Sequence, residues 1–98
     1  MGTYYKIMKG FFFIENHEEL YKLMNQENFK ERYIFKVSND FLEITGFKQE
    51  MKRNGKTEVE FLEALKLACY FGSIMGTGEG EVWVHLLENN NWTFKNLG

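Results

Sequence analysis

The stretch that decides the fold is Thr57–Gly72, which reads Thr-Glu-Val-Glu-Phe-Leu-Glu-Ala-Leu-Lys-Leu-Ala-Cys-Tyr-Phe-Gly. Thr57 and Glu60 have the spacing of a capping box, in which two side chains satisfy backbone N–H groups of the first turn. Gly72 ends the run, as glycine commonly does after a helix. Apolar residues recur at intervals of three and four, which places them on one helical face: Phe61, Leu62, Leu65, Ala68 and Cys69. We therefore predict an amphipathic helix that the remaining elements pack against.

The chain before this helix predicts a strand and a first helix. Tyr4–Ile14 is apolar and aromatic, and Gly10 within it is a candidate bulge. Four consecutive large apolar residues, Phe11–Ile14, predict burial on both faces, as in a central strand. Asn16 is the expected N-cap of the first helix, which should end near Asn28. The inner face of that helix is expected to carry Leu20, Leu23, Met24 and Phe29.

Alternating patterns predict further strands on either side of the central helix. Arg32–Ser38 and Phe41–Met51 should form a hairpin, because the turn pair Asn39-Asp40 separates them. Glycine-rich Ser73–Gly80 suggests a mobile connection after the helix, and Glu81–Glu88 alternates as the last well-defined strand. We read the order as β-α-β-β-α-β.

This order predicts an α+β fold with the ferredoxin-like, split βαβ arrangement over a single domain, residues 1–98. It implies an antiparallel sheet with two helices on one face, and Trp92–Leu97 adds a C-terminal edge strand. The alternative is another α+β layout in which helices back the same sheet. A chain of 98 residues is long enough for one small core.

Composition narrows the class of protein. The single cysteine excludes an internal disulfide, and no apolar run reaches the roughly 20 residues that cross a bilayer. A formal charge of −2 provides no strong field for attracting nucleic acid or anionic lipid. We expect a cytoplasmic protein. Abundant lysine and asparagine, with no proline, suggest an AT-rich source genome such as that of a low-GC bacterium or its mobile elements.

The expected binding surface is the sheet face that the helices leave uncovered. In the strand Glu81–Glu88, we expect Val82, Val84 and Leu86 to face the helices. In the strand Phe41–Met51, we expect the same of Leu42 and Ile44. The alternate residues of both strands then face away from the helices. The predicted partner-binding residues are then Phe41, Phe47, Trp83, His85 and Leu87. A large apolar face on a monomer usually marks an interface. The alternatives are cover by the C-terminal hairpin and stacking of nucleobases on the aromatic rings.

A second candidate surface is the basic cluster, which we define as Lys48, Lys52, Arg53 and Lys56. It is a candidate site for a polyanion such as a nucleic-acid backbone. Four charges give only weak binding that depends strongly on salt concentration. The competing interpretation is a solvated loop whose charge is balanced by nearby glutamates.

Catalytic and metal-binding signals are weak. Cys69 falls on the buried helix face, and neither His17 nor His85 has a second ligand at metal-binding spacing. The glycines of Ser73–Gly80 run from a helix into a strand, which is the wrong order for a phosphate loop. His85 beside Glu43 on the open face is the best acid–base pair that the pattern offers. No metal or cofactor is expected.

These observations favour a small, non-enzymatic protein–protein interaction module. Its partner would be another protein or a second copy of itself, and its size and composition suggest an inhibitor or immunity factor encoded by a phage or mobile element. The first alternative is a nucleic-acid-binding module that uses Phe47, Trp83 and the basic cluster. The second is a small-ligand binder or enzyme centred on His85.

Overall fold

The computed structural model describes residues 4–48, 51–52 and 55–98. The helices of the described residues are α1 (His17–Met24), α2 (Glu27–Lys30) and α3 (Lys56–Ala68). The strands are β1 (Tyr4–Tyr5), β2 (Ile7–Ile14), β3 (Tyr33–Ser38), β4 (Phe41–Phe47), β5 (Met51–Lys52), β6 (Cys69–Gly78), β7 (Glu81–Glu88) and β8 (Asn91–Asn96). The fold is thus α+β, and its radius of gyration of 12.5 Å matches the value of about 13 Å expected for a compact domain of this length.

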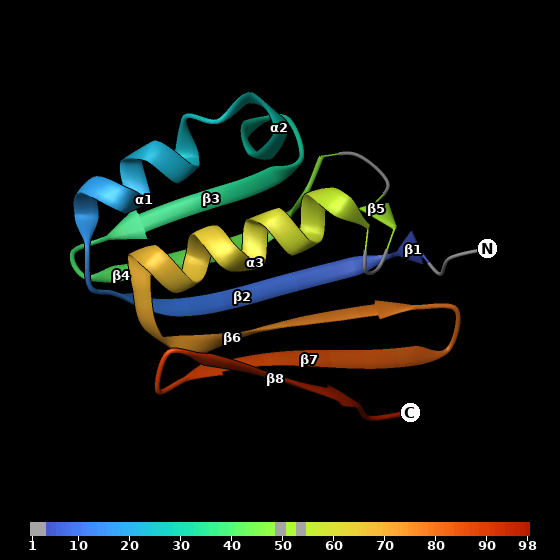
Figure 1. Cartoon of the computed structure of the whole chain (residues 1–98). Helices are drawn as coiled ribbons and strands as arrows, with labels where there is room; N and C mark the ends of the chain where they lie inside the picture. Colours follow the sequence, from blue (N-terminus) through green and yellow to red (C-terminus); the bar gives the residue numbers. More distant parts are fainter. Residues whose placement is uncertain (1–3, 49–50, 53–54) are drawn as a thin grey trace.

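One antiparallel sheet of six strands dominates the described part of the chain, in the order β3-β4-β2-β6-β7-β8. A short second sheet pairs β1 with β5. The helices lie together on one side of the large sheet (Figure 1). The first strand of the large sheet, β2, lies between β4 and β6. Each of its edges therefore pairs with a strand that comes later in the sequence.

The largest correction to the predicted elements concerns β6. The predicted mobile connection Ser73–Gly80 is instead most of a ten-residue strand that pairs with both β2 and β7. The central helix correspondingly ends at Ala68, and Cys69 already has extended backbone angles. Tyr70 and Phe71 fit the helical spacing of apolar residues, but in the structure they belong to the strand.

The start of α3 also differs from the prediction. Gly55 is the N-cap and provides no side-chain cap, so Thr57 lies inside the first turn and the predicted capping box does not form. The prediction for α1 is confirmed, because the backbone N–H of Glu19 donates to the Asn16 side chain at 3.1 Å. That helix stops at Met24, and the remainder of the predicted helix becomes the separate turn of α2.

The strand predictions on either side of α3 are largely confirmed. β3 and β4 form the expected hairpin around Asn39-Asp40, and Asn39 takes the positive φ of 52° that the turn needs. β7 has the predicted bounds, and β8 begins one residue before Trp92. Gly10 pairs regularly with Ile44 and Ile74, so the predicted bulge does not occur there.

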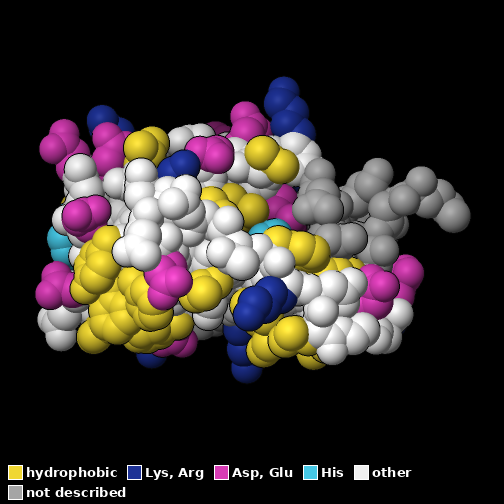
Figure 2. Space-filling view, turned by 60° about the horizontal axis from the view of Figure 1, so that its bottom comes forward, with side chains coloured by type: hydrophobic (Ala, Val, Ile, Leu, Met, Phe, Trp, Pro, Cys, Tyr) yellow, Lys and Arg dark blue, Asp and Glu magenta, His cyan; other side chains and the backbone are white. Residues whose placement is uncertain are grey.

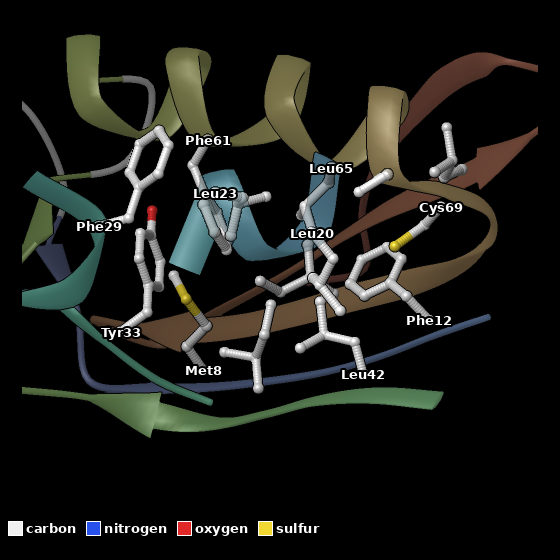
Figure 3. Close-up of a cluster of buried hydrophobic side chains, with 14 of the residues drawn as sticks. Met8, Phe12, Leu20, Leu23, Phe29, Tyr33, Leu42, Phe61, Leu65 and Cys69 are labelled. Atoms are coloured by element: carbon white, nitrogen blue, oxygen red, sulfur yellow. The ribbon is translucent and has the colours of Figure 1, made fainter. Parts of the chain in front are cut away.

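The hydrophobic core fills the space between the helices and the sheet. Figure 3 shows Phe12 and Leu42 pointing from the strands toward the helices, where α1 and α3 contribute Leu20, Leu23 and Leu65. Tyr33 stacks on Phe61 with ring centroids 3.7 Å apart, and this pair joins the β3 edge of the sheet to α3. Because the core lies on one side of the sheet, the opposite side is open.

Candidate binding surface

The open face of the sheet is set by the alternation of side chains along each strand. On β2, Met8 and Phe12 are buried against the helices, whereas Ile7 and Phe11 are 57% and 43% exposed on the other side. The expectation that Phe11–Ile14 is buried on both faces is therefore only half right. The open face carries alternate residues of β4, β2, β6 and β7.

Five aromatic side chains meet on this face, and we call them the aromatic cluster: Phe11, Phe13, Phe41, Tyr70 and Phe71. Ring centroids lie 5.0 Å apart for Phe13 and Phe41 and 5.1 Å apart for Phe11 and Phe41. Phe13 occupies the middle, within 6.0 Å of Tyr70 and of Phe71. Figure 2 shows hydrophobic side chains gathered in a patch on the left of the view, where β2 ends and β6 begins.

A hollow of about 440 Å³ lies beside the aromatic cluster. The small side chain of Ser73, which lies opposite Phe11 at the centre of β6, leaves this space open between larger neighbours. The described residues that line it are Lys9, Gly10, Phe11, Glu43, Ile44, Thr45, Ser73, Met75 and Val84. Phe11 therefore belongs to both the aromatic cluster and the hollow.

The hollow carries one charge of each sign. Lys9 and Glu43 are both exposed and line it from neighbouring strands, β2 and β4. Within the described residues neither side chain forms an ion pair, although Lys36 of β3 lies opposite Glu43 in the register. Both charges are thus available to a molecule that covers this face.

The prediction placed three residues of β7 on the wrong face. Trp83 and Leu87 are fully buried and His85 is 6% exposed, all on the helix side, whereas Val84 lines the hollow on the open face. The cause lies in β6, where Gly76 and Gly72 stand opposite Trp83 and Leu87 and leave room for them, while His85 pairs with Ile74. Because Gly76 has no side chain, the ring of Tyr5 fits against its backbone. The Tyr5 ring packs edge to face on the Trp83 indole, with ring centroids 5.2 Å apart.

The predicted binding residues of β4 are separated by a bulge. Phe41 lies on the open face in the aromatic cluster and is 36% exposed, as expected. Between Phe41 and Phe47 the pairing with β3 skips Thr45, which is an extra residue on β4. This shifts the alternation by one position, so Phe47 is half-buried against the core.

His85 contacts a different glutamate from the one predicted. Glu43 lies on the open face and His85 on the helix side, so the proposed acid–base pair is wrong. Instead, Nε2 of His85 lies 3.7 Å from Oε1 of Glu58, in the first turn of α3, and both residues are buried. The remaining histidine, His17, lies at the surface, where its Nε2 is 3.2 Å from Oδ1 of Asp40.

The basic cluster is only partly described. Lys48 is exposed, and its Nζ donates to the carbonyl oxygen of Lys30 at 3.1 Å. Lys56 is exposed at the start of α3. The side chains of Lys52 and Arg53 lie outside the described residues, so the predicted polyanion site stays a prediction.

Two buried groups have raised pKa values. Desolvation by burial raises the pKa of the Tyr33 phenol far above its usual value, and the nearby Glu58 carboxylate adds to the effect while Arg32 opposes it. Burial also raises the pKa of the Cys69 thiol to about 12. A thiol with that pKa is almost fully protonated at neutral pH, which agrees with the interpretation of Cys69 as a core residue.

Sequence reasoning missed most of the aromatic cluster. The apolar run Phe11–Ile14 predicts burial on both faces for Phe11 and Phe13, and the helical spacing places Phe71 on the helix. The available signal was the spacing of Phe11 and Phe13, since residues two apart on a strand share a face. Tyr70 and Phe71 had no comparable signal, because their position depends on where α3 ends.

Comparison with protein-family models, with curated proteins and with solved structures found no significant match. No helix among the described residues is long and apolar enough to cross a membrane. In the same residues, no three His, Cys, Asp or Glu side chains come together as a metal site would require.

Proposed function

We propose that this protein is a protein–protein interaction module that binds its partner through the aromatic cluster. The observation that carries the proposal is a contiguous group of aromatic rings on a sheet face that the described residues leave uncovered. Its members Phe11, Phe41, Tyr70 and Phe71 are between 36% and 51% exposed. Exposed apolar patches of this kind commonly mark interaction sites, and aromatic residues dominate binding energy at interfaces.

The packing of the rings favours a protein over a nucleic acid. Phe13 meets Phe11 at an interplanar angle of 90° and Phe41 at 63°, so the rings cover part of one another's faces. Base stacking needs an open ring face and usually a basic surround. The formal charge of −2 does not provide such a surround. A mutually packed aromatic surface suits apolar side chains of another protein.

The proposal extends to the finer fold. The order β2-α1-β3-β4-α3-β6 follows the β-α-β-β-α-β pattern, with α2 between α1 and β3, and these strands lie in the order β3-β4-β2-β6. Both features support the ferredoxin-like arrangement, with β7 and β8 added at one edge.

The biological role is proposed on narrower grounds. We propose a cytoplasmic, non-enzymatic inhibitor or immunity factor of a phage or mobile element. The small size, the lysine-rich composition and the free, buried Cys69 support this version. The burial of His85 argues against a catalytic role for it, since a substrate would have to displace α3 or the rings of Trp92 and Phe94 in β8 to reach the imidazole.

Photocrosslinking in the cell of origin tests the proposal. A benzophenone amino acid replaces Phe41 in the aromatic cluster or, as the matched control, Tyr21, an exposed tyrosine of α1 on the helix side. After irradiation we expect a covalent protein adduct from position 41 and none from position 21. The mass of the adduct is read by gel electrophoresis and mass spectrometry.

Three results contradict the proposal. The first is the absence of any adduct at position 41, and the second is an adduct that nuclease treatment removes, which favours the nucleic-acid alternative. An adduct of equal yield at positions 21 and 41 also contradicts it, because the open face would then have no special role.

A further inference from the structure

We infer that the open face binds the open face of a second copy of this chain, in a two-fold dimer. This inference rests on the proposed function, since it names the partner of the same surface. A two-fold interface brings one patch onto the same patch of the other subunit, so that patch must be complementary to itself. Shape and charge on the open face both meet this requirement.

The shape argument concerns the aromatic cluster and the hollow. The aromatic cluster is built from large rings, and the hollow is a recess that the small side chain of Ser73 leaves open. Both lie on one face and share Phe11. A two-fold axis that lies in the interface and passes close to Phe11 exchanges the two regions. Each copy's Phe13 then lies over the Met75 and Val84 wall of the other copy's hollow.

The charge argument concerns Lys9 and Glu43. Glu43 pairs with Phe11 across β4 and β2, and Lys9 lies two residues before Phe11, so the two charges stand on either side of the proposed axis. The same operation places Lys9 of one copy opposite Glu43 of the second copy, and this happens twice. Neither side chain has an ion pair within the described part of its own chain. A formal charge of −2 per chain opposes self-association only weakly.

Reversal of these two charges tests the inference by sedimentation velocity. We expect the wild-type chain to sediment at twice its mass of 11.7 kDa. In a Lys9→Glu dimer, two acidic groups face each other at each of these contacts, and in a Glu43→Lys dimer two basic groups do. Each variant alone should therefore dimerise at least about tenfold more weakly, which corresponds to about 1.4 kcal/mol. An equimolar mixture of the two variants should dimerise again, because both cross-subunit pairs become opposite in sign.

Lys30→Glu is the matched control, since it makes the same charge change on exposed α2 and should leave the dimer intact. A wild-type chain that stays monomeric at every concentration overturns the inference, as does a mixture that fails to restore the dimer. The two proposals fail separately. A monomer that crosslinks to a different protein from position 41 removes only the dimer, whereas a monomer without any adduct removes both.

Discussion

Tyr33 shows how a single buried group can cost stability. Its ring stacks on Phe61, but its hydroxyl is buried and has no hydrogen-bond partner among the described residues. Burial and the Glu58 carboxylate both disfavour the phenolate, which is why the pKa is raised. The ring therefore stabilises the core, whereas the buried hydroxyl lowers the free energy of unfolding.

Tyr33→Phe should increase the free energy of unfolding at pH 7 by about 1 kcal/mol, because an unsatisfied buried hydroxyl is removed and the ring is kept. The pH dependence follows from the raised pKa. Above pH 10 the unfolded phenol ionises while the folded one stays protonated, so the wild type loses up to about 1.4 kcal/mol per pH unit through this residue. The variant should lack that component.

Urea unfolding at pH 7, 10 and 11 measures both effects, with the exposed Tyr21→Phe as the control. A Tyr33→Phe variant that is less stable at pH 7 would show that the hydroxyl has a stabilising partner. An unchanged slope between pH 10 and 11 would contradict the raised pKa.

Among the elements, β6 shows what the sequence could and could not predict. Asn16 and the alternation of Glu81–Glu88 are local signals, and they correctly predict the N-cap of α1 and the bounds of β7. The end of α3 is not local. Tyr70 and Phe71 fit a helical stripe equally well, and their strand conformation follows from pairing with β2, some sixty residues earlier. Periodicity carries no information about that partner.

The face of β7 was unpredictable for the same reason. Both of its faces are apolar, so alternation alone cannot identify the buried one. The choice depends on β6, whose glycines leave room for Trp83 and Leu87 on the helix side. The sequence therefore predicted that an aromatic open face exists, but among the predicted binding residues only Phe41 lies on it.

The glycines of β6 also give a test of the strand. A side chain at Gly72 would place its Cβ 2.7 Å from the Cα of Phe12 and against the carbonyl oxygen of Phe11, and backbone atoms cannot move aside. Gly72→Ala should destabilise the protein by about 3 kcal/mol, which lowers the melting temperature by about 15 °C.

Gly46→Ala is the matched control in this case. Its Cβ would meet only Cδ1 of Ile34 at 3.6 Å, which is an ordinary contact. Its melting temperature, measured by circular dichroism, should stay close to that of the wild type. Equal losses in the two variants would mean that the close packing of β6 on β2 is not what Gly72 provides.

The described part of the chain forms two layers, which are the sheet and the helices on one of its faces. All described helices lie on one side of the sheet (Figure 1), so no element of the described part of the chain covers the aromatic cluster. The sequence predicted this two-layer α+β architecture correctly, because the count and type of elements follow from local patterns. It could not predict the six-strand order, which depends on pairings between distant segments.

If a second copy provides that cover, stability must depend on protein concentration. The urea midpoint of the wild type should rise between about 1 and 100 µM, since a partner present at 100 times its Kd adds about 2.7 kcal/mol. Lys9→Glu should show a smaller rise over this range, because its dimer is at least about tenfold weaker. A wild-type midpoint independent of concentration would contradict the dimer, whatever the crosslinking result.

The central position of β2 affects how the chain folds during its synthesis. The ribosome makes residues 7–14 some sixty residues before β6, so one edge of β2 stays unpaired until Cys69–Gly78 has emerged. Throughout that interval the nascent chain presents an aromatic strand edge, the kind of surface that chaperones cover and that aggregates recruit. The emergence of β6 thus determines how long β2 remains exposed on that edge.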